Sequence, residues 1–310
     1  MNNPKVRILL AAWNGAAYLR PLLDSLLAQD VDCFQIIASD DGSTDETPAI
    51  LDAYAAQHPG RVVRYRAPQR FGNAQGHFWH LMTAFADTPY LMFCDQDDIW
   101  HPDKVRRTLE RMEIMDQSCP ALVHTDLRVV DRELREIAPS FLRYAGLDGQ
   151  KTYFNRLLVQ NVVTGCTVMI NRALARLAAS APPEQDMLMH DWWLALLASS
   201  CGLLAFLPEA TIDYRQHGGN AVGAKDARSL SYLLGRLRGD QARAAYWRCI
   251  LQARAFLHAY GDELSPAWRG LCRAFAETPQ RGKFSRIACY RRMKLWKQGL
   301  PRCIGQILWW

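Results

Sequence analysis

Three carboxylates stand directly after an apolar segment in the first third of the chain, and their spacing suits a divalent metal. The apolar residues 90–94 lead into Asp95, Asp97 and Asp98. Open α/β sheets bind ligands at their strand ends, and carboxylates crowded at such a place repel one another unless a cation joins them. Mg²⁺ is usually held by one or two carboxylates, while the phosphates of a substrate supply further oxygens. The pattern Asp95-x-Asp97 therefore predicts a metal and diphosphate site.

The same acidic residues have a structural alternative. A helix is expected from near Pro102, and Asp98 or His101 stands where such a helix begins. A polar side chain at that position stabilises the first turn by accepting hydrogen bonds from backbone N–H groups. An Asp-x-Asp pair is too common to decide between the two interpretations, so the decision rests on the other motifs.

Polar clusters also follow the first two strands that the sequence predicts. The apolar run 8–12 ends in Ala12, Trp13, Asn14 and Gly15, and the run 35–39 ends in Asp40, Asp41 and Gly42. A tryptophan at this edge can stack on a nucleobase, and an aspartate can accept a hydrogen bond from the imide N–H of uracil or thymine. The alternatives are core packing for Trp13 and a tight turn with a helix cap for the acidic cluster.

A third loop can approach the same nucleotide. Residues 70–76 contain Phe71, Gly72 and Asn73 and precede a predicted helix around 77–86. Backbone N–H groups at the start of a helix attract phosphate. We therefore expect these residues beside the donor site.

Strand and helix signals alternate through the first 130 residues. Further strands are expected at 61–65 and 90–94, and helices are expected at 19–27 and after the capping box Ser43-x-x-Glu46. This alternation predicts an α/β fold with a mostly parallel sheet and helices on both faces. The segment 192–208 is predicted to form a buried helix, a turn and a strand.

The composition excludes several classes of protein. With 310 residues, 49% of them hydrophobic and 22% charged, the chain is long enough for one large globular domain and an appendage. Nine scattered cysteines without a Cys-x-x-Cys pair argue against a disulfide framework and a structural zinc site, which fits a reducing cytosol. The apolar segment near the N-terminus is too short for a signal peptide, and the stretch 192–208 is shorter than the roughly 20 apolar residues that span a bilayer.

Other functions that use a similar composition fit less well. A nucleotidyltransferase would carry a Gly-rich, Lys-containing triphosphate loop, and a dinucleotide oxidoreductase would carry Gly-x-Gly-x-x-Gly after the first strand. The net charge of +6 could attract nucleic acid, but the basic residues concentrate away from the acidic strand ends, so no nucleic-acid partner is expected. A noncatalytic module that binds a nucleotide sugar or a glycan remains an alternative.

Seven motifs occur in the order found in family 2 glycosyltransferases. They are Ala12–Gly15, Ser39–Asp45, Phe71–Asn73, Phe93–Trp100, Thr164–Thr167, His190–Trp193 and Tyr214–His217. Over about residues 5–225 the chain resembles this family, most strongly its bacterial rhamnosyltransferase-like members. The resemblance implies a GT-A (Rossmann-like) fold, a nucleoside-diphosphate-sugar donor, a divalent metal (Mg²⁺ or Mn²⁺) and inversion at the anomeric carbon. It suggests dTDP-linked rhamnose as the donor, although a UDP-linked hexose would use the same residues.

The resemblance also implies roles for individual residues. Asp191 is the expected catalytic base, Asp40 or Asp41 holds the nucleobase, and Asp97 is the nearest metal ligand, with Asp95 and His217 beside it. The remaining donor-site residues are Ala12, Trp13, Asn14, Phe71, Gly72, Asn73 and Gln96. The expected acceptor site consists of Gly165, Cys166, Thr167, Trp192 and Trp193, and Arg215 and His217 are expected at the diphosphate. Ala12 and Trp13 stand where relatives often carry threonine and tyrosine, a departure that concerns the donor.

Several of these residues have structural alternatives. Asp191 opens an apolar helix, so it also stands where a helix N-cap is expected. Burial beside Trp192 and Trp193 would raise its pKa and make it a better base, but the two tryptophans can equally be core residues. The segment 164–167 can be a strand with a glycine bulge, and His217 can be structural.

The character of the chain changes after about residue 225. Helices are expected around 230–237 and 242–260, and no Asp or Glu follows Glu277. The cations of this tail are Arg281, Lys283, Arg286, Arg291, Arg292, Lys294, Lys297 and Arg302. Interleaved with aromatic residues, they are typical of an anchor on an anionic membrane leaflet. The alternative is a helical appendage packed on the catalytic domain with a solvated basic face.

We therefore predict two parts. Residues 1–225 form a GT-A catalytic domain, and residues 226–310 form a basic, aromatic helical region. The expected enzyme is cytoplasmic, can lie on the inner face of the cell membrane, and acts on a glycan or a lipid-linked oligosaccharide.

Overall fold

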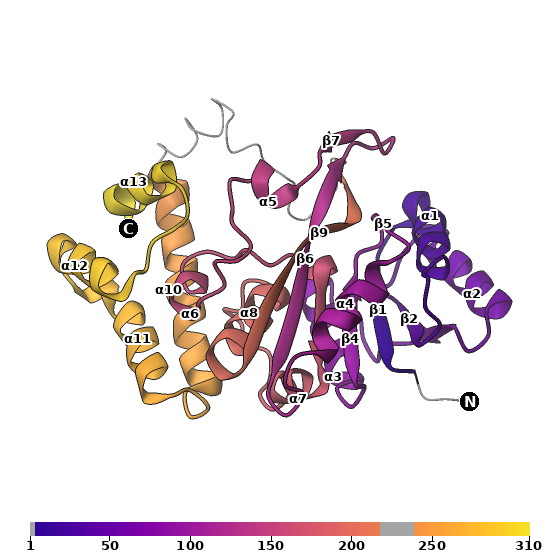
Figure 1. Ribbon diagram of the computed structural model, residues 1–310, viewed down its shortest axis with the longest axis horizontal. Coiled ribbons are helices and arrows are strands. Elements are labelled where there is room, and N and C mark those ends of the chain that lie inside the picture. Colours follow the sequence, from indigo (N-terminus) through magenta and orange to yellow (C-terminus); the bar gives the residue numbers. More distant parts are fainter. Residues whose placement is uncertain (1–3, 218–238) are drawn as a thin grey trace.

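The computed structural model describes residues 4–217 and 239–310 (Figure 1). The first half of the chain forms β1 (Val6–Ala12), α1 (Ala16–Leu27), β2 (Phe34–Asp40), α2 (Thr47–Gln57), β3 (Val62–Tyr65), α3 (Ala74–Ala84), β4 (Tyr90–Cys94), β5 (Ile99–Trp100), α4 (Lys104–Glu113), β6 (Ala121–Val130) and β7 (Glu136–Ala138). The second half forms α5 (Phe141–Tyr144), α6 (Phe154–Leu157), the 3₁₀ turn η1 (Gly165–Thr167), β8 (Val168–Asn171), α7 (Arg172–Ala179), α8 (His190–Cys201) and β9 (Leu203–Arg215). The C-terminal region forms α10 (Gly239–Tyr260), α11 (Pro266–Ala276), η2 (Thr278–Gln280), α12 (Lys283–Met293) and α13 (Leu300–Trp309).

One curled sheet runs through the molecule in the order β3-β2-β1-β4-β8-β6-β9-β5, and β7 pairs with β6. The strands β3, β2, β1 and β4 are parallel, as the sequence predicts. Strand β8 runs antiparallel to both β4 and β6, and β5 runs antiparallel to β9. The predicted α/β fold is confirmed, and β6 and β9 form a further parallel pair in the second half of the sheet.

Alternating side chains of the strands feed two cores on opposite faces of the sheet. On β1, Leu9 belongs to one core, while Val6, Ile8 and Leu10 belong to the other. The helices α1, α2 and α4 cover the second core, and α3, α7 and α8 cover the first. The strands β1, β2 and β4 are mostly buried on both faces, which explains why their sequences are rich in apolar residues, whereas the edge strand β3 is only partly buried.

The C-terminal helices extend the first core and do not form a core of their own. Trp193 of α8 lies edge-on to Phe256 and Tyr260 of α10, with ring centroids 5.3 and 6.2 Å apart. Figure 1 shows α10 beside α8, with α11, α12 and α13 on the outer side. The alternative of an appendage packed on the catalytic domain is therefore confirmed for α10. The predicted boundary at residue 225 and the predicted helix at 230–237 lie outside the described residues.

Two local predictions are wrong. The N-cap of α2 is Glu46, so Ser43 does not open this helix; its hydroxyl instead accepts the N–H of Asn14, 2.8 Å away. Helix α4 begins after Asp103, while Asp98 is fully buried and His101 contacts Asp213 at 2.8 Å. The acidic residues after β4 therefore do not serve as a helix cap.

The expectation for the segment 192–208 is confirmed, and the cysteines form no disulfide framework. All nine cysteines are free thiols. Helix α8, a turn at Gly202 and β9 occupy the segment predicted as helix, turn and strand. In the part of the chain that the structure describes, no helix is both long enough and apolar enough to cross a membrane.

We predict that Trp193→Ala lowers the free energy of unfolding by about 3–5 kcal/mol. The side chain of Trp193 is 1% exposed, so its removal leaves a cavity between α8 and α10. The control is Trp13→Ala, since Trp13 is 51% exposed and its loss should change stability by less than about 0.5 kcal/mol. Urea denaturation followed by circular dichroism measures both. Equal effects of the two substitutions would contradict the assignment of Trp193 to the core.

Candidate functional site

The loops after β1 and β4 are joined by one glutamine side chain. Gln96 accepts the N–H of Trp13 through Oε1 at 2.7 Å and donates through Nε2 to the carbonyl of Trp13 at 2.9 Å. A Cβ atom added to Gly15 would lie 2.2 Å from Oε1 of Gln96, so a larger residue there would displace the Gln96 side chain. The predicted donor residues Trp13 and Gln96 are thus brought together, and Gln96 positions the tryptophan through its backbone.

The loop after β2 is joined to the loop after β1. Asn14 has a φ of 48°, and its side-chain oxygen accepts the N–H of Thr44 at 2.8 Å. An asparagine tolerates this left-handed conformation better than most residues. The ends of β1 and β2 therefore form one connected surface, on which the ring of Trp13 is exposed. The core alternative for Trp13 is wrong.

The two aspartates after β2 have different tasks in the structure. Asp41 is 5% exposed and accepts the N–H groups of Phe71 and Gly72 at 2.6 and 2.7 Å. Asp40 is less buried and folds back on the turn, accepting the N–H groups of Gly42 and Ser43 at 3.1 and 3.2 Å. Asp41 thus holds the 71–73 loop against the end of β2, and Asp40 is the more accessible carboxylate.

The 71–73 loop begins α3. Asn73 is its N-cap and accepts the N–H of Gly76 at 2.7 Å through Oδ1. Phe71 stacks on His77 with ring centroids 5.6 Å apart and an interplanar angle of 11°. The predicted loop is therefore well positioned beside Asp41, and the side-chain oxygen of Asn73 is engaged by the helix.

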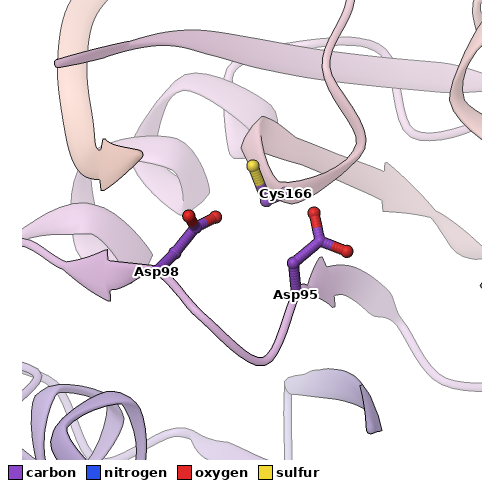
Figure 2. A group of neighbouring side chains, drawn as sticks. All are labelled: Asp95, Asp98 and Cys166. Carbon is purple, nitrogen blue, oxygen red and sulfur yellow. The ribbon is translucent and has the colours of Figure 1, made fainter. Parts of the chain in front are cut away.

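The acidic cluster consists of Asp95, Asp98 and Cys166 (Figure 2). One ligand atom from each of the three side chains lies within 4.8 Å of the others, and Figure 2 shows the carboxyl groups and the thiol pointing into the same space. Among the described residues, Oδ2 of Asp98 finds no hydrogen-bond partner although it is buried. This orphaned oxygen and its neighbouring carboxylate are suited to a hard divalent cation.

The protonation of the acidic cluster reflects crowding in a dry place. Burial, followed by the charges of Asp97 and Asp191, raises the pKa of Asp95 to about 7. Burial, followed by Asp95 and Asp97, also raises the pKa of Asp98 well above its usual value. Each carboxylate resists ionisation because its neighbours are negative, and a bound cation would remove that cost. The residues therefore fit the metal that the sequence predicts.

The predicted metal ligands Asp97 and His217 contact each other beside this cluster. His217 contacts Oδ2 of Asp97 through Nε2 at 2.7 Å, and its ring stacks on Tyr18 with centroids 4.7 Å apart. Arg215 lies over the same tyrosine at 5.1 Å and donates through Nε to the carbonyl of Asp97 at 3.0 Å. The structure thus brings Asp97, Arg215 and His217 together, while the residues that follow the motif, 218–238, lie outside the described part of the chain.

Asp191 lies in the first turn of α8. Its N-cap is Met189, so the interpretation of Asp191 as the N-cap is wrong. A side chain at Gly165 would meet this helix, because a Cβ atom there would lie 2.9 Å from Nε2 of His190 and 3.7 Å from Oδ2 of Asp191. Gly165 of η1 therefore allows Asp191 to approach the acidic cluster, a finding that agrees with the effect of Asp191 on the pKa of Asp95.

Burial dominates the protonation of Asp191. It raises the pKa of this carboxyl to about 7, while hydrogen bonds from the N–H groups of Trp192 and Gly165 and from Asn161 oppose the shift. A carboxylate with a pKa near the working pH can accept a proton from a weakly acidic hydroxyl more readily than an ordinary aspartate. The next residue back, His190, is enclosed by Phe78 and Phe93, and burial lowers its pKa to about 3.

The predicted acceptor residues divide into two groups. Gly165, Cys166 and Thr167 form η1 and enter β8 beside Asp191, and the bulge alternative is replaced by a 3₁₀ turn. Trp193 is buried in the core, so it offers no platform to a sugar. Trp192 is partly buried and donates through Nε1 to the carbonyl of Leu157 at 2.6 Å.

Three residues of the site escape the sequence reasoning. Asp98 belongs to the acidic run that suits a metal, but it is not among the predicted metal ligands, which are Asp95, Asp97 and His217. Tyr18, in the first turn of α1, holds His217 and Arg215 through tertiary stacking that no local pattern reveals. Lys104 is fully buried behind the cluster with Nζ 4.5 Å from the ring centroid of Trp100, and burial lowers its pKa to about 8.

Comparisons with known proteins agree with this geometry. The family model described as Glycosyl transferase family 2 matches residues 8–177, more than half of the chain. The dTDP-rhamnosyl transferase RfbG of Shigella flexneri is 27% identical over 228 residues, which cover 69% of this chain and 74% of that protein.

Solved structures show the same fold. TarS from S. aureus in complex with UDP-GlcNAc has a TM-score of 0.58 at 15% identity, covering 93% of this chain and 79% of that one. The mannosyltransferase PcManGT of Pyrobaculum calidifontis in complex with GDP-Man and Mn²⁺ has a TM-score of 0.51 at 14% identity, covering 99% and 80%. The chain belongs to glycosyl transferase family 2 and has the GT-A fold of these enzymes.

Proposed function

We propose that the protein is an inverting, metal-dependent glycosyltransferase that moves rhamnose from dTDP-rhamnose to a glycan or a lipid-linked oligosaccharide in cell-surface polysaccharide synthesis. The observation that carries this proposal is the approach of Asp191 to the acidic cluster at the end of β4. The similarity to a dTDP-rhamnosyl transferase supports the donor sugar. The exposed ring of Trp13 and the accessible carboxylate of Asp40 suit a pyrimidine base.

The donor would lie across the three strand ends. Trp13 stacks on the nucleobase, and Asp40 accepts its imide N–H. Asp97, with Arg215 and His217 beside it, lies at the diphosphate, where Tyr18 keeps the two basic side chains in place. Asp95, Asp97 and His217 would hold the metal together with Asp98, which the structure adds to the predicted set. A bound Mg²⁺ or Mn²⁺ ion would neutralise the negative charge that grows on the diphosphate as it leaves.

Asp191 supplies the proton chemistry. An acceptor hydroxyl is a poor nucleophile until its proton is taken, so the carboxylate of Asp191 accepts that proton as the oxygen bonds to the anomeric carbon. The bond from this carbon to the diphosphate breaks on the opposite side, which inverts the configuration. The products are the new glycoside, the nucleoside diphosphate and a proton on Asp191. We infer that the acceptor approaches Asp191 on the side of η1, where Gly165 and Thr167 are buried beside it.

We predict that Asp97→Ala abolishes metal-dependent nucleotide binding. Wild-type protein should gain about 2.7 kcal/mol of stability from dTDP or UDP at a hundred times the dissociation constant, with Mn²⁺ or Mg²⁺ present. The variant should lose this gain because the metal and the diphosphate share that carboxylate. Thermal unfolding with a panel of nucleoside diphosphates measures the effect. Asp87→Ala, at an exposed position paired with Arg176, is the control and should respond as wild type. A wild type that responds to no nucleotide would overturn the proposal.

We predict that Asp191→Asn lowers kcat by about 10²–10⁴-fold without changing the nucleotide-dependent stabilisation, because only the proton acceptor is lost. In the wild type, kcat/KM should fall as the pH drops below about 7, since the raised pKa of Asp191 leaves it protonated there. Initial rates across a pH series measure this limb. Substantial transfer by the variant would contradict the role of Asp191, and an inactive wild type would favour the binding-module alternative.

We predict a pH-dependent stability effect of the same substitution. The folded pKa of Asp191, about 7, lies above its usual 3.8, so its protonated form stabilises the fold below pH 3.8 and that contribution is lost as the pH rises to 7. Asp191→Asn should therefore be more stable than wild type at pH 8, by on the order of 1–4 kcal/mol, and similar to it at pH 4. Urea denaturation at both pH values checks the sign. A variant less stable at pH 8 would indicate that the carboxylate is stabilised in the fold.

We also propose that the enzyme works at the inner face of the cell membrane. Helix α13 supports this, because its aliphatic side chains face the solvent while two of its polar side chains face the protein. Leu300, Ile304, Ile307 and Leu308 are 37–73% exposed, whereas Arg302 and Gln306 are 8% and 1% exposed. Arg302 donates to the carbonyls of Ala145 and Gly146, and Gln306 donates to the carbonyl of Leu295 at 2.7 Å.

An outward aliphatic face on a basic tail matches an anionic lipid surface. The helix is tied to the protein by its polar side chains, so its apolar side is left to solvent. Interfacial helices bury such a face at the boundary between headgroups and acyl chains, and nearby Lys and Arg residues add attraction to anionic lipids. The tail from Thr278 onward carries only basic charges. We therefore propose that this face of α13 binds an anionic bilayer.

We predict that the full-length protein sediments with phosphatidylglycerol vesicles and not with phosphatidylcholine vesicles. The double substitution Ile304→Glu and Leu308→Glu should reduce the bound fraction at least tenfold, because it places charge on the inserted face. Ile114→Glu, at a position 76% exposed at the end of α4, is the control and should bind as wild type. Equal binding of the double variant would overturn this role of α13, and a change of its oligomeric state would indicate that a second copy covers the face.

A further inference from the structure

A large basic cavity lies away from the strand ends, between the segment 151–156, α11 and α12. Its volume is about 1220 Å³. Five of its lining residues are cations, Lys151, Arg156, Arg281, Arg292 and Lys294, and the lining contains no Asp or Glu. The cations come from three separate segments of the chain, so the cavity is built by the fold and not by one basic helix.

The charges that line this cavity are poorly neutralised. In the described ranges, 4–217 and 239–310, no carboxylate forms an ion pair with Arg281, Arg292 or Lys294, whereas Lys151 lies 3.6 Å from Asp148. Arg156 is held by its Nη1, which donates to the carbonyl of Trp296 at 2.7 Å. Like charges converging on one cavity repel one another, and an anion bound between them removes that cost.

The helix dipole accounts for only part of this arrangement. Arg292 stands in the last turn of α12, where a cation complements the negative end of the helix. Lys151 and Arg156 belong to a different segment, and Arg281 precedes the helix. The cavity therefore needs an explanation beyond helix capping, and the chemistry of its lining points to an anionic ligand.

The size of the cavity and its aromatic residues limit the kinds of anion that would fit it. Tyr153 is 70% exposed at the cavity, and Trp268 is partly buried, edge-on to Phe154 at 5.4 Å. Arginine forks bind phosphate oxygens in pairs, and aromatic rings beside them suit a sugar or a glycerol group. A cavity of this volume is larger than a lone phosphate needs.

A short path of contacts links the cavity to Asp191. Asn155 of α6 lines the cavity and donates to the carbonyls of Met293 and Lys294 at 3.1 and 3.2 Å. Two residues later, the carbonyl of Leu157 accepts Nε1 of Trp192, the neighbour of Asp191. Helix α6 therefore lies between the cavity and the N-terminus of α8, and it is fixed on both sides.

We propose that this cavity is an anion site for the phosphate groups of a lipid. The shared chemistry is a phosphate ester, and it has two sources: the diphosphate that links an acceptor glycan to a lipid carrier, or the phosphodiester of an anionic phospholipid. The first source rests on the proposed glycosyltransferase function, whereas the anion site itself does not. In either case the site holds the lipid headgroup on the far side of α6 from the catalytic base.

Calorimetric titration of the full-length protein with inorganic diphosphate, in the presence of a metal chelator, tests the site. Arg292→Glu should weaken binding at least tenfold, because it reverses a charge that lines the cavity. Arg291→Glu is the matched control: Arg291 precedes Arg292 in the same helix, is also exposed, and does not line the cavity, so binding should stay within twofold of wild type. No binding by wild type, or an equal loss in the two variants, would overturn the proposal.

Competition then identifies the source of the phosphate. Phosphatidylcholine vesicles that carry a polyprenyl diphosphate should displace inorganic diphosphate if the carrier is the ligand, and phosphatidylglycerol vesicles should displace it if a phospholipid is. Displacement by neither would show that the lipid assignment is wrong. Arg292→Gln removes the charge without reversing it and should give an intermediate loss of diphosphate binding. It therefore tests the site even if the Arg292→Glu variant misfolds.

The metal-dependent stabilisation by dTDP or UDP separates this inference from the proposed function. Arg292→Glu should retain the full stabilisation, since Arg292 lies outside the donor site. Asp97→Ala should lose that stabilisation and retain diphosphate binding in the chelator. Each proposal can therefore fail while the other stands.

Discussion

The structure depends on the crowding of carboxyl groups at the end of β4. Asp95 and Asp98 are held within a few ångströms of each other beside Cys166, and Asp97 and Asp191 add their charges. In a dry environment such a group is unstable in its ionised form, because neither water nor a nearby partner offsets the repulsion. The ammonium of Lys104, whose pKa burial lowers to about 8, lies behind the cluster and offers a single positive charge to several carboxyl groups. A divalent cation at the front would add to this charge. The fold therefore holds carboxyl groups whose mutual repulsion a bound cation would relieve.

That constraint explains why the surrounding loops are fixed by side chains rather than left to solvent. Gln96 holds the backbone of Trp13, Asn14 holds Thr44, and Asp41 holds Phe71 and Gly72. Each bond ties together two strand ends, so the nucleotide would meet a preformed surface. Preorganised groups stabilise a developing charge without a cost of reorganisation at the moment of reaction. The glycines at 15 and 165 belong to the same design, since a Cβ atom at either position would push a polar side chain out of place.

Much of this arrangement is predictable from the sequence, because it follows from short-range patterns. The strands β1, β2 and β4 are rich in apolar residues, and each ends in one of the polar clusters that form the site. Ser43 and Asp98 mark the limit of such reasoning: both stand where a helix cap is plausible, and tertiary contacts give them other partners. Trp193 and Trp192 show the same limit, since a sequence cannot tell which of two adjacent tryptophans turns toward α10. Tyr18 has no local signal at all, because its stacking on His217 joins residues almost two hundred positions apart.

In the C-terminal region, the fold decides which side chains face the protein and which face the solvent. From the sequence the tail is basic and aromatic, and either an anchor or a packed appendage satisfies that description. In the structure part of this tail packs on the domain, while the aliphatic residues of α13 stay exposed. Trp310 and Tyr246 pack together at 5.2 Å on the inner side, while the aliphatic residues of α13 face outward because Arg302 and Gln306 bond to backbone carbonyls of the protein. Burying an arginine is costly unless carbonyls receive its N–H groups, and the segment 145–146 provides them. The hydrogen bonds of Arg302 and Gln306 thus set the orientation of α13. A hydrophobicity pattern alone would turn these polar residues toward the solvent and the aliphatic residues toward the core. In the structure the aliphatic face of α13 is instead exposed to water.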